Sequence, residues 1–444
     1  MSQAIQQLPP GPSQNFFASL WLFYHVVKKP YDALLRLQEK YGDTFAIRTI
    51  GTGVTVFTGN PDHVKDVFAM SPDHFTMMDT PRIEFFFGRR SLFTSEGETH
   101  RRDKKLIFPH FRGERMRAYA DTIVECTRKL CNQNIGKGTV SLLDVAQATT
   151  IEVMLQALLG VRRPEHLKEI SDVFMGWNAA QNPLLGIPFM HNRLFKPYRE
   201  FVHYNQELCR FVQVLIEENR AGDGGTDILS LMVRSQYEDG TFMEDEHITD
   251  HMKTLLVAGF DTTANAITWG MDTIFRTPEL LRKLREELDS MPEDASLDDM
   301  SNLPLLDATC YEMMRLNPPL EMIPTRKLSK PLQMGPYLLP AGYGVMACPI
   351  MTQRHSELYP NPDEFRPERF LGKRPNVFEY FPFGGGRRLC AGYAFANYQL
   401  RLVIGTAIKE YDFDVVGQAP KAKRYSVVVG PGGNTPTIVS KRST

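Results

Sequence analysis

The stretch 383–392 constrains this chain more than any other part of it. It reads Phe-Gly-Gly-Gly-Arg-Arg-Leu-Cys-Ala-Gly, and its three consecutive glycines leave backbone that a flat molecule can approach closely. The apolar-periodic run 393–408 predicts a helix directly afterwards. The positive end of that helix, with the neighbouring Arg387 and Arg388, is expected to lower the pKa of the Cys390 thiol. Thiolate is the form that ligates metal.

A single cysteine is most often a buried structural residue, so the alternative is a glycine turn without a cofactor. The spacing Phe-x-x-Gly-x-Arg-x-Cys-x-Gly, however, resembles the haem-binding loop of the cytochrome P-450 family. Its five fixed positions are held by Phe383, Gly386, Arg388, Cys390 and Gly392. The resemblance implies that Cys390 ligates the iron of haem b, that Phe383 packs near the sulfur, and that Arg388 pairs with a propionate. Thiolate ligation favours O–O cleavage at the iron.

The chain has 444 residues, of which 42% are hydrophobic, and exceeds the usual length of one domain. No linker, charge block or repeat marks a boundary, so we expect one domain over residues 1–444. The resemblance implies a mainly α fold with small β-sheets, the single large cytochrome P-450 fold. A net charge of −1 gives no strong field toward nucleic acid. Six scattered cysteines favour a reducing compartment over a disulfide framework or a structural zinc site.

Residues 1–29 form an N-terminal segment whose apolar run, 16–27, is too short to span a bilayer. Only eight residues precede the proline-rich stretch 9–12, whereas membrane-bound members of the family carry a full anchor before such a hinge. We therefore expect a cytoplasmic protein without a transmembrane anchor. A peripheral helix that touches lipid is the alternative.

Spacing along the first part of the chain predicts a helix over 30–41, two strands within 44–57 and a helix over 61–70. The aromatic segment 75–93 has no clean period, so it is either a loop packed on the core or an apolar wall of a binding pocket. The resemblance implies that 75–95 and 181–197 are loops that cover the substrate.

Two charged positions follow the first of these loops. His100 and Lys104 share one helix face at i,i+4 spacing, and the resemblance implies that both bind haem propionates. Arginine is more usual where Lys104 stands, and lysine lacks the planar fork that makes a bidentate contact. By the same resemblance Arg326 is a further propionate partner.

The stretch 244–277 is the longest predicted helix, and polar Asp261 and Thr262 lie at its apolar centre. Thr262 can bond back to the carbonyl of Ala258 and bend the helix, while Gly259 removes bulk beside the bend, which could open a groove for O2 and water. The alternative is an ordinary buried helix. The resemblance implies an oxygen-activating motif in which Asp261 supplies protons and Thr262 holds the reacting species and its water.

Glu312 and Arg315 are spaced i,i+3 on a helix, which alone is a weak signal. A Pro-Glu-Arg-Phe segment with Arg369 follows, and the resemblance implies a structural trio of Glu312, Arg315 and Arg369 that supports the haem loop. The segment 353–355, Gln-Arg-His, departs from the family's common His-Arg pair, and the sequence offers no interpretation of that departure.

The function implied is a haem-thiolate monooxygenase that uses O2 to hydroxylate or epoxidise a lipophilic molecule such as a fatty acid, terpenoid or steroid. Arginines 82, 89 and 90 could anchor a carboxylate and so favour a fatty acid. A peroxygenase or isomerase, and a haem sensor without turnover, are the alternatives. The expected pocket residues are Phe85, Phe86, Phe87, Phe93, Leu185, Ala258, Phe260, Leu320, Met322 and Ile323.

No flavin or iron–sulfur module is visible in the sequence, so we expect electrons from a separate ferredoxin or flavodoxin with its reductase. Such a donor would be small and acidic, and it would dock on a basic face. The residues expected to form that face are Arg101, Arg102, Lys105, Arg112 and Arg387.

Overall fold

The computed structural model describes residues 8–12, 20, 24–49, 53–77, 80–186, 188–222, 225–425 and 427–443. Residues 50–52 of the predicted strand pair, most of the apolar run 16–27 and the side chain of Arg82 lie outside the described residues. The helices are α2 (Pro30–Tyr41), α3 (Pro61–Ala69), α4 (Thr80–Phe87), α5 (Gly97–Ile107), α6 (Glu114–Arg117), α7 (Ala120–Asn134), α8 (Leu142–Leu159), α9 (Pro164–Ala179), α10 (Lys196–Ala221), α11 (Ile228–Arg234), α12 (Asp245–Phe275), α13 (Pro278–Asp289), α14 (Leu297–Ser301), α15 (Pro304–Leu316), α16 (Pro349–Gln353) and α17 (Tyr393–Glu410).

The strands form four small sheets. They are β1 (Thr44–Thr49), β2 (Gly53–Thr58), β3 (Phe75–Met77), β4 (Thr139–Ser141), β5 (Arg326–Leu328), β6 (Leu332–Met334), β7 (Tyr337–Leu339), β8 (Gly344–Ala347), β9 (Tyr411–Val415), β10 (Ala422–Tyr425), β11 (Val428–Pro431) and β12 (Pro436–Lys441). The largest sheet has the order β1-β2-β8-β5-β3, in which only β2 and β8 are parallel. The others are β4-β12-β9, β10-β11 and β6-β7. The expected mainly α fold with small sheets is confirmed.

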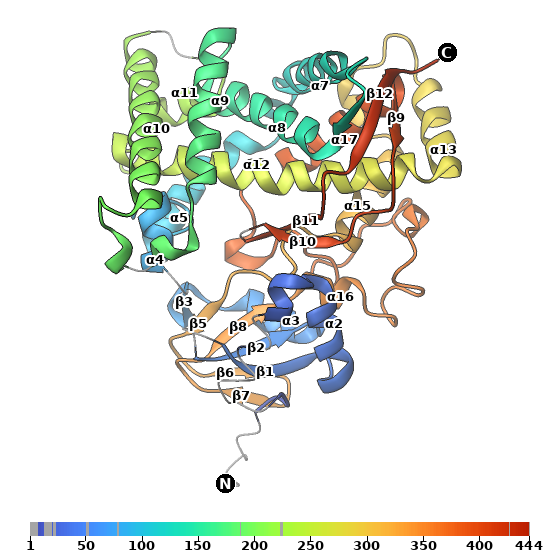
Figure 1. Cartoon of the computed structure of the whole chain (residues 1–444). Helices are drawn as coiled ribbons and strands as arrows, with labels where there is room; N and C mark the ends of the chain where they lie inside the picture. Colours follow the sequence, from blue (N-terminus) through green and yellow to red (C-terminus); the bar gives the residue numbers. More distant parts are fainter. Residues whose placement is uncertain are drawn as a thin grey trace, which may run out of the picture.

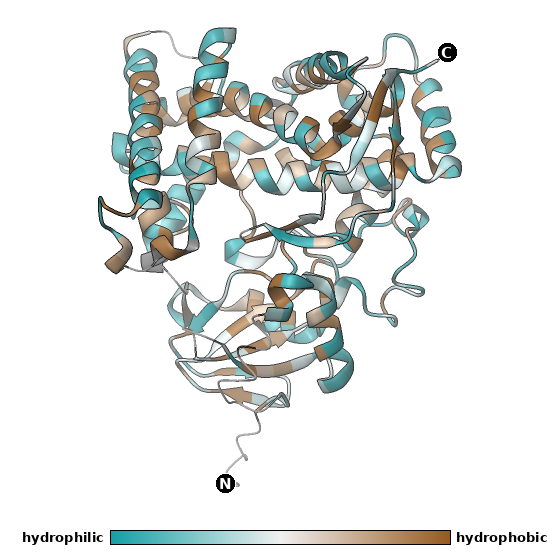
Figure 2. Ribbon diagram, viewed as in Figure 1, coloured by the Kyte–Doolittle hydropathy of each residue, from teal (hydrophilic) through white to brown (hydrophobic). Residues whose placement is uncertain are grey.

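Most of the helices gather in one part of the molecule, and the five-stranded sheet lies beside them together with α2, α3 and α16 (Figure 1). Helix α12 crosses the helical part from one side to the other, with α8 packed along it (Figure 1). Hydrophilic and hydrophobic residues alternate along α10 and α13, as expected where one face of a helix meets water (Figure 2). On α13 the buried stripe is Leu280, Leu284 and Leu288.

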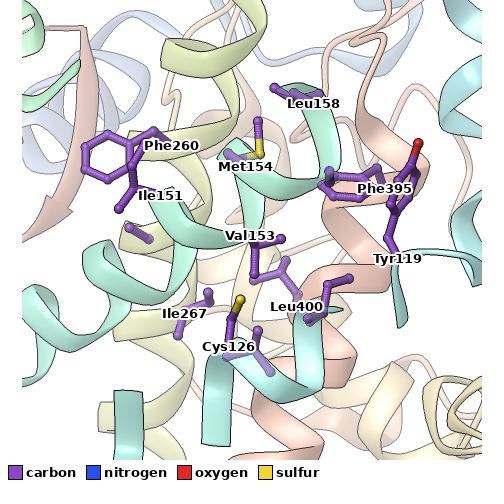
Figure 3. Close-up of a cluster of buried hydrophobic side chains, with 14 of the residues drawn as sticks. Tyr119, Cys126, Ile151, Val153, Met154, Leu158, Phe260, Ile267, Phe395 and Leu400 are labelled. Carbon is purple, nitrogen blue, oxygen red and sulfur yellow. The ribbon is translucent and has the colours of Figure 1, made fainter. Parts of the chain in front are cut away.

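The main core forms where α7, α8, α12 and α17 meet (Figure 3). Ile151 and Met154 of α8 lie beside Phe260 and Ile267 of α12, and all four are buried. Helix α8 is long and apolar enough to cross a membrane by length and composition alone, but 67% of its apolar window is buried inside the protein. It is therefore accounted for as a core helix.

Gly259 lies where α8 and α12 come closest. A Cβ added to Gly259 would lie 2.2 Å from Met154 Cε, so the space beside the glycine is filled by a methionine of α8. The groove for O2 and water expected beside Gly259 stays a prediction, and on the side of the missing side chain the space belongs to Met154. The missing side chain of Gly259 allows two core helices to approach.

Several local predictions are confirmed and one is wrong. The helix over 30–41 and the two strands within 44–57 are present, and β1 pairs with β2 in antiparallel register from Thr44↔Thr58 to Thr49↔Gly53. The segment 75–93 is not a continuous loop, because residues 80–87 form helix α4. Aromatic packing explains this helix, since Phe85 and Phe86 both contact Phe201 of α10, at 4.9 and 5.2 Å between ring centroids.

The second expected loop, 181–197, contains two short 3-10 turns, Pro183–Gly186 and Pro188–Met190, and its last two residues begin α10. Leu185 anchors it in the core, and the carbonyl of Leu185 lies 2.7 Å from His191 Nε2. His191 stacks on Phe85 at 4.1 Å between ring centroids, which holds the loop over α4. Phe189 and Leu194, by contrast, project outward and are 88% and 86% exposed. Ile187, in the same loop, lies outside the described residues.

Candidate functional site

The glycine–cysteine stretch forms a tight loop before α17. Its backbone closes on itself, with Gly384 N donating to Phe381 O at 2.9 Å and Cys390 N donating to Phe383 O at 3.1 Å. Gly386 has φ of +62°, and a Cβ there would lie 2.2 Å from the carbonyl oxygen of Phe68. Glycine is therefore required at this position by both backbone conformation and space.

Cys390 follows Arg387 and Arg388, which line a recess together with His100 and Lys104. Its side chain is accessible to solvent, yet the surrounding protein is dense enough that burial raises the pKa of the thiol. A hydrogen bond involving the backbone of Gly392 and the charge of Lys104 act in the opposite direction and lower this pKa. The expectation that Arg387 and Arg388 lower the pKa of Cys390 is therefore wrong, because the cation that acts on the thiol is Lys104 and the effect of burial is larger.

Two cations that line this recess, Lys104 and Arg388, and the nearby Arg326 are bound mainly by backbone carbonyls. Arg326 is 1% exposed and donates to Val67 O and, at 3.2 Å, to Gly385 O. Arg388 donates to Leu92 O at 3.2 Å and to Ser95 O at 2.9 Å, and Lys104 Nζ donates to Arg387 O and Leu389 O at 2.8 and 3.1 Å. Among the described residues, none of the three forms an ion pair with a carboxylate.

Burial and mutual repulsion disfavour the charges of this group. Burial, and after it the charge of Arg388, lowers the pKa of Arg326 to about 10 and that of Lys104 to about 8. His100, between the same cations, has its pKa lowered to about 3 by burial and by the charges of Arg388 and Lys104, so the imidazole is neutral. Buried cations without a partner are costly, so the recess fits a ligand with more than one negative charge.

Haem b fits these requirements. Its two propionates would neutralise Arg326, Arg388 and Lys104, and its iron would meet the accessible thiol of Cys390. The structure thus brings the predicted residues His100, Lys104, Arg326, Arg388 and Cys390 close to one another, from α5, β5 and the loop before α17. Gly392 begins α17 as its N-cap residue, and Phe383 packs against Tyr393 at 6.4 Å between ring centroids.

The polar centre of α12 has the predicted back-bond. Thr262 Oγ1 donates to Ala258 O at 2.6 Å, which confirms that expectation. Burial raises the pKa of Asp261, and a hydrogen bond from Asn178 of α9, at 3.4 Å to Asp261 Oδ2, acts against this rise. Sequence patterns do not point to Asn178, because only the fold relates position 178 to position 261.

One strip at the centre of α12 is partly exposed, between two buried stretches of the helix. Ala258, Asp261 and Thr262 are partly exposed, whereas Phe260 is fully buried and packs edge-to-face on Phe174 of α9 at 5.3 Å. Of the expected pocket residues, Leu185 is likewise fully buried in the core. The expected pocket residues therefore divide into a set with buried side chains and a set whose side chains are partly exposed to solvent.

The remaining expected pocket residues occupy different positions. Phe87 is buried and contacts Trp177 and Phe93, and Phe93 is 39% exposed. Ile323 is buried near the cysteine loop, since a Cβ on Gly384 would lie 3.7 Å from Ile323 Cγ2. Phe85, Phe86, Leu320 and Met322 are half-buried.

The structural trio forms a buried ion-pair network. Arg315 Nε and Nη2 donate to the two carboxylate oxygens of Glu312, at 2.6 and 2.8 Å, and neither side chain is exposed. Arg369 Nε lies 3.3 Å from Glu312 Oε1, and the backbone N–H of Arg366 donates to the same oxygen at 2.8 Å. Here, unlike in the recess, the positive charges have a carboxylate partner within the protein.

The predicted basic face is only partly available. Arg101, Arg102 and Lys105 form ion pairs with Glu98, Asp239 and Glu238 respectively. Arg112 stacks instead on the rings of Phe108 and Tyr393, at 4.2 and 5.2 Å, and is exposed, as is Arg387. Neither Arg112 nor Arg387 has an ion pair within the part of the chain that the structure describes.

Comparison with known proteins is consistent along the whole chain. A model of the family described as Cytochrome P450 matches residues 9–436. Two proteins of Mycobacterium tuberculosis, named "Putative cytochrome P450 138" and "Putative cytochrome P450 137", are 29% identical over 395 residues and 28% identical over 412 residues. These alignments cover 86% and 90% of this chain and 86% and 84% of the relatives.

A solved structure has the same fold. Retinoic acid bound cyanobacterial CYP120A1 matches with a TM-score of 0.86 at 20% identity, over 98% of this chain and 100% of that one. Together with the family match over nearly the full length, and with a recess that fits haem, these similarities identify the chain as a member of the cytochrome P450 family, a haem-containing monooxygenase.

Proposed function

We propose that this enzyme activates O2 at a haem iron ligated by Cys390 and hydroxylates or epoxidises a lipophilic small molecule. The observation that carries the proposal is the surroundings of the cysteine loop, where an accessible thiol lies close to Lys104 and where Lys104, Arg388 and buried Arg326 form no ion pair with a carboxylate among the described residues. When bound, the haem supplies the redox-active iron at which O2 is reduced. Arg326, Arg388 and Lys104 would hold its propionates, and neutral His100 could donate a further hydrogen bond to one of them.

Proton delivery is assigned to α12. The raised pKa of Asp261 lets its carboxyl hold a proton closer to neutral pH than an ordinary aspartate does. The Thr262 hydroxyl donates its hydrogen to Ala258 O, so its oxygen can accept a hydrogen bond from a water molecule. Asp261 would supply the proton and Thr262 would orient the water that carries it toward the recess.

The ligand role of Cys390 is tested by the carbon-monoxide complex of the reduced protein. The wild-type protein should show the red-shifted Soret band typical of thiolate ligation, and Cys390→Ala should lose it. Gly392→Ala is the matched control, because a Cβ there meets no atom within 4 Å, and its band should persist. A red-shifted band in Cys390→Ala would remove Cys390 from the iron.

The proton role of Asp261 predicts a change in pH dependence. A general acid works below its pKa, so the alkaline limb of the kcat profile should report the pKa of Asp261. Asn178→Leu removes a hydrogen bond that favours the carboxylate, so this limb should move to higher pH by roughly one unit. Asp261→Asn should abolish the limb and lower kcat by about 10²-fold. An unchanged limb in Asn178→Leu would contradict the assignment.

The proposed substrate class is a fatty acid, terpenoid or steroid-like molecule, because the segments assigned to the pocket are predominantly apolar. A carboxylate anchor is less available than the sequence indicates. Arg89 lies 3.7 Å from Glu84 and Arg90 is paired with Glu244, so a fatty acid would have to displace surface carboxylates. Such exposed pairs are worth only about 0–1 kcal/mol, which leaves displacement feasible.

Spectral titration with a fatty acid and its matched alcohol separates these cases. If Arg89 and Arg90 anchor a carboxylate, the acid should bind more tightly than the alcohol, and Glu84→Gln with Glu244→Gln should widen the difference by freeing both arginines. Equal affinities in the wild-type protein and in this double variant would discard the anchor. Binding only of small polar compounds would discard the substrate class.

For the electron donor we propose a separate, small, acidic ferredoxin or flavodoxin that docks near Arg112 and Arg387. Arg112→Glu should slow reduction of the haem at low ionic strength by about tenfold, through loss of steering. Arg101→Glu is the control, because Arg101 is already paired with Glu98 and its loss should change the rate less. Reduction of the wild-type protein that does not depend on salt would contradict this docking face.

A further inference from the structure

Gln353 makes a set of contacts that neither the sequence nor the proposed mechanism explains. It ends helix α16 and is fully buried. Its side-chain Nε2 donates to Met314 O at 3.1 Å and to Arg315 O at 3.0 Å, and its Oε1 accepts the backbone N–H of Phe381 at 3.0 Å. The amide orientation is unambiguous, because two carbonyls face the nitrogen and one N–H faces the oxygen. A single side chain thus joins the end of α15 to the segment that leads into the cysteine loop.

The ion-pair trio does not contact the cysteine loop by itself. Beyond their contacts with one another, Arg315 donates to the carbonyls of Gln353, Pro362 and Glu364, and Arg369 donates to Asn361 O. Glu312 accepts from the backbone of Arg366. Among the described residues, none of these hydrogen bonds reaches residues 383–392. Gln353 contacts both parts. Its backbone carbonyl accepts a hydrogen bond from Arg315 Nη1 at 2.7 Å, and its side chain accepts one from the backbone of Phe381, just before the loop.

Phe381 passes the constraint on to the loop. Its carbonyl accepts from Gly384 N at 2.9 Å, and its ring packs edge-to-face on Phe68 at 5.4 Å. Phe68 in turn closes over the loop glycines, since a Cβ on Gly385 would lie 2.3 Å from its ring. Displacing Phe381 would therefore release both the first turn of the loop and the aromatic ring that covers it.

We propose that Gln353 is a positioning residue that fixes the cysteine loop, and thereby Cys390, against the buried Glu312–Arg315–Arg369 network. The proposal rests on the assignment of Cys390 as iron ligand. The position calls for two donors and one acceptor at once, which glutamine supplies. Glutamate would keep the acceptor and turn an oxygen toward two carbonyls, neutral histidine would keep one donor and one acceptor, and leucine would leave all three backbone groups without a partner.

Two measurements on Gln353→Leu, Gln353→Glu and Gln353→His test this role. The first is amide hydrogen exchange at Phe381, Gly384 and Cys390, which reports on the loop directly. Leucine and glutamate should speed this exchange by about tenfold or more, as expected when buried hydrogen-bonding groups lose their partners, and histidine by less. The second is the absorption spectrum of the carbon-monoxide complex of the reduced protein. The leucine and glutamate variants should lose more of the thiolate-type band than the histidine variant, and the band of a protonated or displaced thiol should replace it.

Gln399→Leu is the matched control. Gln399 is also a fully buried glutamine, on α17 after the cysteine loop, but neither side-chain amide atom has a hydrogen-bond partner among the described residues. Its replacement should leave both the exchange rates and the thiolate-type band unchanged. Wild-type exchange at Phe381 and a stable thiolate-type band in Gln353→Leu would overturn the proposal.

The two readouts separate this inference from the proposed function. If the wild-type protein lacks the thiolate-type band, the ligand role of Cys390 fails, while exchange at Phe381 still decides whether Gln353 holds the loop. If Gln353→Leu does not fold, Gln353→His decides the question, because it retains part of the hydrogen bonding. Faster exchange at Phe381 with an unchanged band would restrict Gln353 to a structural role and overturn its effect on Cys390.

Discussion

The rest of the site depends on buried cations that the protein does not neutralise. Arg326, Arg388 and Lys104 lie around the cysteine loop, and their hydrogen bonds go to backbone carbonyls. Carbonyl dipoles reduce the cost of burying a charge without cancelling it. An anion must come from outside the chain, and the haem propionates supply two negative charges. The same side chains also make hydrogen bonds that hold the backbone of the cysteine loop and of the segment beside it. The residues that would bind the anion therefore also fix the shape of the loop.

A second buried polar cluster lies nearby and has the opposite character. Glu312, Arg315 and Arg369 satisfy one another and the surrounding backbone, so this cluster requires nothing from a ligand. A complete buried network of this kind gives rigidity and a unique arrangement more than net stability. The loop lies between a network that is complete and a group of cations that is not. This difference distinguishes the charged side chains that stabilise the protein itself from those proposed to bind the haem.

Much of the site could be predicted because its signals are local. The glycines, Cys390 and Arg388 lie within ten residues, and the back-bond of Thr262 follows from the i,i−4 geometry of any helix. What could not be predicted involves contacts between distant segments. Residues 80–87 form a helix because Phe85 and Phe86 pack on Phe201, and the space beside Gly259 is filled by Met154 of another helix. The pKa of Cys390 likewise depends on burial and on Lys104, neither of which its sequence neighbours reveal.

The sequence by itself determined the family, the cofactor and which residue is proposed to meet the iron, because spacing within one loop and along one helix is a covalent property of the chain. Only the tertiary structure decided which contacts hold the cysteine loop and the centre of α12, and which charged side chains have no ion-pair partner among the described residues. Gln353 joins α15 to Phe381 across 38 and 28 positions of sequence, and Asn178 reaches Asp261 across 83. Three of the five predicted docking cations are paired with carboxylates, two of these on a distant segment. Such pairings arise only when packing brings remote segments within hydrogen-bond range, and no local pattern encodes that distance.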